Sequence, residues 1–420
     1  MTPGGSSLSY DAAPSFATPL RFFLTAPVFG IAAGILLVLM PGLLDSRWTP
    51  GALAITHLIT VGFMLMIMVG AMFQILPVVI GASLPRADLL ASIVHVCLAA
   101  GTITLSWGLG SMNPDILLAA VVLLGSGSAL FLAAASHALW RVPISQASQR
   151  DMRLALISLA IAIMLGLALA MVLARGVPLP LLSMLKLHVG WAWLGGAGIL
   201  LAATSWVVVP MFQITPAYPT PITRYWGLTT CAALIAWSAG VLLGVSVLES
   251  MLVLVLIVLA AVFVVTTLRL QLRSRRSTPD ATFRMFQFGM LNVSAGIACV
   301  LAAQYWDSPV LPVLAGVLVL YGGFVSIIEG MLYKIVPFLA WLHLIQDGIK
   351  APNMRKLQPD GPVWWQTRSH MIAVGALVVA IVAGHETLIR MCGLLVAFEF
   401  AWLVTNLLRV VRAYRAARPA

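Results

Sequence analysis

Charged residues are scarce in this chain. Only 9% of its 420 residues are Asp, Glu, Lys or Arg, whereas 61% are hydrophobic, and the mean hydropathy is +1.04. Soluble domains carry roughly a quarter charged residues, so the composition excludes a soluble enzyme, a disordered chain and a nucleic-acid-binding domain. The sequence also lacks a Walker motif, a nucleophile elbow, a dinucleotide fingerprint and a zinc-protease motif. These absences leave an integral membrane protein.

Cysteine is rare as well, with four residues and no C-x-x-C or other metal-binding spacing. Cys97, Cys231, Cys299 and Cys392 fall singly in four apolar segments. We therefore predict that they are small packing residues.

Apolar segments long enough to cross a bilayer, which takes roughly 20 residues, are abundant. Twelve are predicted, at about 19–43, 51–81, 88–108, 115–140, 152–176, 183–212, 223–245, 250–272, 284–305, 310–345, 364–384 and 387–412. Residues 1–18 are small, polar and rich in Pro and Gly, which predicts a disordered lead-in, and residues 413–420 are a basic tail. The predicted organisation is a single transmembrane domain, 19–412, of the all-α class.

The basic residues divide unequally between the two sides of such a bundle. With twelve spans, 19 of the 24 Lys and Arg fall on the side of the termini, four fall on the other side, and Lys334 lies within a span. Lys and Arg favour the cytoplasmic side of membrane proteins. The distribution predicts that both termini are cytoplasmic. The net charge of +11 thus reflects orientation rather than an acidic partner.

A short pattern recurs in the second, sixth and tenth segments: GAMFQILPVV, ATSWVVVPMF and GMLYKIVPFL. In each, a small residue stands seven positions before a proline, namely Pro77, Pro210 and Pro337. The prolines are 133 and 127 residues apart, so the pattern predicts three pseudo-repeated four-helix blocks. The alternative is that Gly and Pro are simply frequent in membrane helices.

Two of the seven histidines hold matching places in this repeat. His57 and His188 precede Pro77 and Pro210 by 20 and 22 residues, near the predicted outer side, and each lies close to glycines such as Gly62 and Gly190. Imidazole is the usual axial ligand of haem iron, so we predict His57 and His188 as candidate haem ligands. The alternative is that each forms an interhelical hydrogen bond. His95, His137, His343 and His370 fall towards the cytoplasmic side, and His385 falls in an outer loop.

Three ionisable residues fall deep within predicted spans: Glu329, Lys334 and Glu399. An ionisable side chain at this depth is costly unless it is paired or hydrated, so it is a functional candidate. Glu329 and Lys334 are poorly placed to pair on one helix, and Glu399 could pair with Lys334 or line a proton path. Gln74 occupies the repeat position of Lys334. The alternative is an interhelical charge pair with a structural role.

The stretch HLITVGFMLMIMVGAMFQILPVVIGASLPR, from His57 to Arg86, resembles the second helix of subunit I of the haem-copper oxidases. The twelve spans, the cytoplasmic termini and the three four-helix arcs also resemble that superfamily. The resemblance implies a b-type haem on His57, with His188 as a candidate second ligand. The chain departs from the family in two places. Its tenth segment lacks the histidine pair that ligates haem in the family, and its seventh segment has no histidine to ligate copper, so copper is not expected. The shorter NnrS-type relatives are similar in size.

Together with the resemblance, the sequence predicts a haem-binding protein of a bacterial inner membrane. Its expected role is electron transfer, sensing, or haem- or nitrogen-oxide-related respiration rather than oxygen reduction, and enzymatic activity stays open. The expected partners are the lipid bilayer and a cytochrome or respiratory-complex subunit, with no nucleic acid. Two alternatives stay open. One is a transporter or channel for a small solute or protons that uses Glu329, Lys334 and Glu399, and the other is an assembly factor for a respiratory enzyme.

Overall fold

The computed structural model describes residues 13–418 and contains no strand within them. Twelve helices are long and apolar enough to cross a membrane, which confirms the predicted all-α membrane fold. Most of the predicted lead-in lies outside the described residues, and the first helix begins at Ala17. The last described helix ends at Ala417, within the predicted basic tail.

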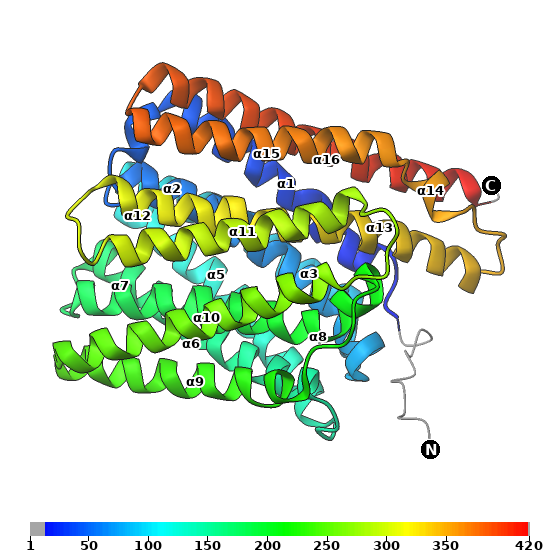
Figure 1. Ribbon diagram of the computed structural model, residues 1–420, viewed down its shortest axis with the longest axis horizontal. Coiled ribbons are helices and arrows are strands. Elements are labelled where there is room, and N and C mark those ends of the chain that lie inside the picture. Colours follow the sequence, from blue (N-terminus) through cyan, green and yellow to red (C-terminus); the bar gives the residue numbers. More distant parts are fainter. Residues whose placement is uncertain (1–12, 419–420) are drawn as a thin grey trace. The chain divides into compact units, whose positions relative to one another are not determined.

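Nine of the twelve spans are single α-helices: α1 (Ala17–Leu39), α4 (Ala87–Ser111), α5 (Pro114–Trp140), α6 (Ala147–Arg175), α9 (Thr220–Leu243), α10 (Ser246–Leu272), α11 (Ala281–Ala302), α15 (Asp360–Ala383) and α16 (Glu386–Ala417). Short helices η2 (Pro41–Leu44) and α14 (Met354–Leu357) lie in connections. Figure 1 shows the elements coloured along the chain.

The second, sixth and tenth spans each change helical form within the membrane. The second span consists of α2 (Pro50–His57), η3 (Leu58–Leu65), α3 (Met66–Ile75) and η4 (Leu76–Ile80). The sixth consists of α7 (Leu181–Gly190), η5 (Trp191–Gly198) and α8 (Ile199–Gln213). The tenth consists of α12 (Val310–Gly316), η6 (Val317–Val325) and α13 (Ser326–Gln346).

Each of these three spans contains a π-helical segment at a corresponding position. Segments η3, η5 and η6 are π-helical. Their last residues, Leu65, Gly198 and Val325, each stand twelve positions before Pro77, Pro210 and Pro337. Short π-helical turns are uncommon and frequently mark functional sites. The recurrence is what a repeat would produce, and the repeat itself stays a prediction.

The chain divides into two compact units. One unit comprises the described residues before Phe16 together with 71–101 and 113–276, and the other comprises 16–70, 102–112 and 277 to the end of the described chain. Two of the unit boundaries fall within α3 and α4, and the others fall outside the spanning helices.

In the unit that contains α1 and α16, these two helices pack closely because small residues meet at their crossing. A Cβ atom added at Gly393 would lie 2.7 Å from the carbonyl oxygen of Gly34 and 2.8 Å from Cβ of Leu37. Small residues allow backbones to approach in membrane proteins, where van der Waals packing drives helix association. Helix α16 also lies beside α15, as Figure 1 shows, and contacts α13. This packing brings three helices of the C-terminal third together.

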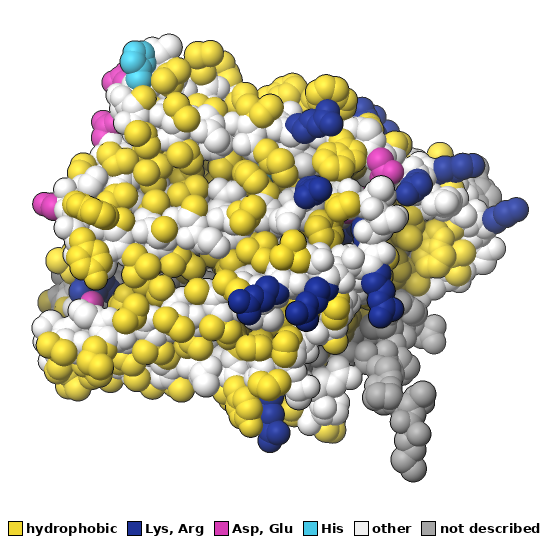
Figure 2. Space-filling model, viewed as in Figure 1, with side chains coloured by type: hydrophobic (Ala, Val, Ile, Leu, Met, Phe, Trp, Pro, Cys, Tyr) yellow, Lys and Arg dark blue, Asp and Glu magenta, His cyan; other side chains and the backbone are white. Residues whose placement is uncertain are grey.

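In the other unit, α6 is the central helix and contacts α5, α7, η5, α8 and α9. Hydrophobic side chains are spread widely over the face of the molecule seen in Figure 2. Exposed Leu, Val, Ile, Met and aromatic residues occur along most spans. Contiguous exposed apolar surface is expected where lipid is the solvent.

Candidate functional site

Three ionisable side chains meet in the interior of the unit that contains α1 and α16: Glu329 of α13, His370 of α15 and Glu399 of α16. All three have no exposed surface. One nitrogen or carboxylate oxygen from each lies within 4.8 Å of the others. We call this group the Glu–His–Glu cluster. It is the one group of three or more His, Cys, Asp or Glu residues in the described chain with metal-binding spacing.

A glutamine one helical turn from His370 holds the two carboxyl groups together. The Nε2 atom of Gln366 donates hydrogen bonds to Oε2 of Glu329 and Oε2 of Glu399, each 2.8 Å long. The hydroxyl of Tyr321, on η6, donates to Oε1 of Glu399 at 2.9 Å. Gln366 and His370 stand four positions apart and thus share one face of α15. The carboxyl oxygens are therefore oriented by donors on two other segments.

The imidazole of His370 is oriented by a chain of two hydrogen bonds. Ser326 donates its hydroxyl proton to the carbonyl of Gly322 at 2.7 Å, and His370 Nε2 lies 2.8 Å from the same hydroxyl oxygen. Because a hydroxyl has a single proton, Nε2 must be the donor to Ser326. The Nδ1 atom then faces the carboxyls, 3.2 Å from Glu399 Oε1 and 3.6 Å from Glu329 Oε2.

This arrangement leaves the cluster short of positive charge. Two carboxylates in an apolar interior repel each other unless a cation or a proton lies between them. Within the described chain, Oε1 of Glu329 has no hydrogen-bond partner although it is buried. Two carboxyl groups, one of which has an unpartnered oxygen, and an imidazole nitrogen close to both are a set of donors suited to a metal ion. Ser326 would then act as the partner that orients the ligating imidazole.

Lys334, predicted as a deep charge that could pair with Glu399, pairs with Asp280 instead. Its Nζ lies 2.5 Å from Oδ2 of Asp280, and the two side chains are 26% and 22% exposed. Asp280 also caps α11 by accepting from the amide of Phe283. Burial opposes ionisation of Asp280, but Lys334 and the Phe283 amide outweigh it and hold the pKa of the carboxyl below its ordinary value. The two residues form a partly exposed ion pair apart from the cluster.

This ion pair predicts a pH-dependent contribution to stability. A carboxyl whose pKa is lower when folded stabilises the protein above its ordinary pKa of 3.8, and the contribution is lost as the pH falls through the folded value. We expect Lys334→Met to lower the melting temperature by a few degrees at pH 7, for a cost of about 1 kcal/mol. The difference from wild type should shrink below about pH 4. A difference of equal size at pH 3 and pH 7 in a detergent-based melting assay would contradict this assignment.

His57, at the end of α2, points one ring nitrogen at its own helix. The Nδ1 atom lies 2.7 Å from the carbonyl oxygen of Leu53. Donation from Nδ1 would leave the lone pair on Nε2, which suits an axial ligand. At Gly62, the nearby glycine, the space is filled, because a Cβ there would lie 2.5 Å from Cγ of Phe29. The donor chemistry of His57 therefore fits a haem, and a haem that extended to Gly62 would have to displace Phe29.

His188, at the end of α7, belongs to the other unit and packs against α6. Its Nδ1 lies 2.9 Å from the carbonyl oxygen of Ala162, and a Cβ at Gly166 would lie 2.9 Å from its Cε1. Gly190 likewise has the ring of Trp237 where a Cβ would go. These contacts are those of an interhelical hydrogen bond, the alternative weighed for this histidine.

Two other buried polar residues, Gln74 and Asp151, belong to the unit that does not contain the cluster. Gln74 of α3 is buried, and its Oε1 lacks a hydrogen-bond partner within the described residues. Asp151 of α6 is fully buried, although the sequence did not single it out as a deep acid. Its carboxylate pairs with Arg150 at 2.6 Å and accepts from Trp206 Nε1 at 2.9 Å. Asp151 therefore has a structural ion pair that balances its charge.

Comparison with known proteins supports the fold alone. No protein-family model matches the sequence, and no curated protein matches it. A solved cryo-EM structure of a haem-copper terminal oxidase dimer is similar to this chain with a TM-score of 0.64 and 13% sequence identity. The similarity covers 95% of this chain and 85% of that chain. The chain thus has a haem-copper oxidase-like fold.

The sequence predicted two of the three members of the cluster and missed the third. Glu329 and Glu399 are functional candidates by their depth, whereas His370 was placed towards the cytoplasmic side and not linked to them. The structure adds that link, since Nδ1 of His370 lies close to both acids. The spacing of Gln366 and His370, four apart within the eleventh segment, is a signal that could have indicated a polar face on that helix.

Proposed function

We propose that this protein is a membrane metalloprotein whose Glu–His–Glu cluster holds one divalent transition-metal ion. Two observations support this most directly. Oε1 of Glu329 is buried without a hydrogen-bond partner in the described chain, and Oε2 of the same carboxyl group lies 3.6 Å from Nδ1 of His370. Two carboxylates would neutralise the charge of the ion, which lowers the cost of burying it in a low-dielectric interior. Carboxylate and imidazole donors favour iron, manganese or zinc over Cu(I).

The role that we propose is one-electron transfer or sensing within a bacterial inner membrane, with both termini in the cytoplasm. Three protein ligands leave open coordination positions on the metal, and iron or manganese in the site could change oxidation state. Oxygen reduction by the family reaction is not proposed, because the sequence lacks the histidines of a copper site. A cytochrome or another respiratory subunit would be a suitable electron partner.

The metal content of the purified protein tests the proposal. We expect close to one equivalent of iron, manganese or zinc per chain after removal of loosely bound metal by a weak chelator. The protein should be purified in detergent from cells grown with all three metals, and its content measured by mass spectrometry. Protein that holds no metal, and takes up none when each ion is added back, would contradict the proposal.

Haem b at His57, with His188 as the second predicted ligand, is a separate proposal. It is supported by the oxidase-like fold and by the Nδ1 hydrogen bond of His57, and a bound haem would have to displace Phe29. The expected result is a Soret band in the purified protein that is lost in His57→Ala and kept in His343→Ala. Colourless protein from haem-replete cells would refute haem binding and leave the metal site unaffected.

A further inference from the structure

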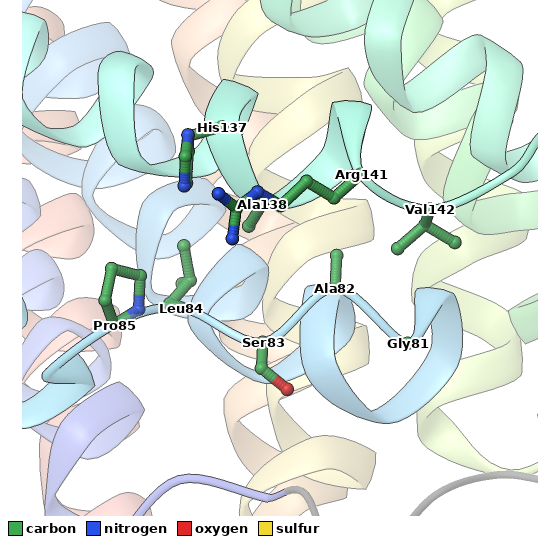
Figure 3. A pocket seen from close by; sticks show the side chains of 9 residues that line it. All are labelled: Gly81, Ala82, Ser83, Leu84, Pro85, His137, Ala138, Arg141 and Val142. Atoms are coloured by element: carbon green, nitrogen blue, oxygen red, sulfur yellow. The ribbon is translucent and has the colours of Figure 1, made fainter.

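A second site is formed at the end of α5, in the unit that does not contain the Glu–His–Glu cluster. A cavity of about 410 Å³ lies between the loop 81–85, which follows η4, and the end of α5 with the residues just after it. Figure 3 shows His137 and Arg141 side by side on the α5 side of this cavity, across from the loop. We call it the loop pocket.

The loop pocket offers hydrogen-bond donors and positive charge without an acid. His137 and Arg141 are exposed, and neither side chain makes a hydrogen bond or ion pair within the described chain. In the loop, the backbone amides of Ser83 and Leu84 donate to no acceptor within the described residues. None of the nine lining residues is Asp or Glu. Guanidinium and backbone N–H groups are the usual donors to phosphate oxygens.

Both walls of the pocket are held in place by α6. Gln149 donates to the carbonyl of Ile80, just before the loop, at 3.5 Å. Arg153 donates to the carbonyls of Leu139 and Val142 at 3.0 and 2.5 Å. Its guanidinium also lies 5.3 Å from the ring centroid of Trp140. The pocket is therefore formed before any ligand binds, which lowers the entropic cost of binding.

We propose that the loop pocket binds a phosphate group, using the guanidinium of Arg141, the imidazole of His137 and the two loop amides. The charge distribution predicts that this end of α5 faces the cytoplasm. Trp140, which precedes the lining residue Arg141 in the chain, is 47% exposed. Anionic lipids are abundant in cytoplasmic leaflets and attract such basic residues. A lipid headgroup and a soluble anion share this phosphate chemistry, and separate titrations with each distinguish the two sources.

The test compares Arg141→Ala with Arg273→Ala, another exposed arginine on the same predicted side but outside the pocket. Full-length protein in detergent is titrated with phosphatidylglycerol, with phosphatidylcholine and with inorganic phosphate, and its melting temperature is recorded. We expect stabilisation by phosphatidylglycerol, with at least about fivefold weaker apparent affinity in Arg141→Ala and unchanged affinity in Arg273→Ala. His137→Gln should weaken binding in the same direction.

The outcomes decide both the site and the source of the phosphate. Stabilisation by inorganic phosphate that is likewise lost in Arg141→Ala would assign the pocket to a soluble anion. Equal responses to phosphatidylglycerol and phosphatidylcholine, together with no response to phosphate, would overturn the proposal. So would identical affinities in Arg141→Ala and wild type. None of these results bears on the metal site, which lies in the other unit.

Discussion

Glu399→Gln is expected to remove most of the bound metal while leaving the fold intact. Glutamine keeps the shape of the side chain. Its oxygen can accept from Gln366 and its amide N–H can donate to the hydroxyl of Tyr321, but it loses the negative charge and one strong metal ligand. Replacing residues that only orient a ligand already weakens metal binding by about 10- to 100-fold. Loss of a direct ligand should therefore leave less than about a tenth of the wild-type metal after chelator treatment. The same result is expected for Glu329→Gln.

Matched substitutions elsewhere in the chain separate this effect from a general one. Glu386 is also on α16, but its side chain is 71% exposed, so Glu386→Gln should keep the full metal content. His370→Gln should lose the metal, and His385→Gln, in an exposed position before α16, should not. Ser326→Ala is expected to lie between these extremes, because Ser326 only orients the imidazole. Full metal retention by Glu329→Gln and Glu399→Gln together would refute the site.

Gly393→Ala is expected to destabilise the protein strongly for the addition of a single methyl group. The new Cβ would meet the backbone of Gly34 and Val38 at 2.7 and 2.9 Å, and backbone atoms cannot move aside cheaply. Overpacking of this kind typically costs about 1–3 kcal/mol, and the crossing of α1 and α16 would have to open along its length. A melting temperature lower by at least several degrees is expected in detergent.

Gly375 provides the control for that substitution. It also lies within a membrane helix, α15, but a Cβ there would meet nothing within 4 Å. Gly375→Ala should be neutral or slightly stabilising, since alanine favours the helix by up to about 1 kcal/mol. If both variants melt at the same temperature as wild type, the close crossing of α1 and α16 is not important for stability.

The architecture was predictable from the sequence because it depends on local properties. Segment length and hydropathy predict spanning helices directly, and all twelve predicted segments correspond to helices in the structure. The unequal placement of Lys and Arg adds an orientation, which the structure leaves as a prediction. The π-helical turns in η3, η5 and η6 were not predicted, because their wider hydrogen-bonding pattern leaves no simple periodic signal in an apolar sequence.

The site was only half predictable, since it depends on which faces of separate helices meet. The cost of burying a charge singled out Glu329 and Glu399. It could not show that His370, from a third helix, lies beside them. Lys334 was misleading because its partner, Asp280, lies in a connection just before α11 and outside the predicted spans. Glycines near His57 indicated space for a cofactor, but long-range packing by Phe29 occupies it.

The most direct test of the metal site is pulsed electron paramagnetic resonance on protein loaded with Mn²⁺. We predict a ¹⁴N coupling from one directly bound imidazole, because Nδ1 of His370 faces both carboxyl groups. That coupling should disappear in His370→Gln and persist in His385→Gln. A spectrum of bound Mn²⁺ without any nitrogen coupling, or a coupling that survives in His370→Gln, would contradict the assignment of the Glu–His–Glu cluster.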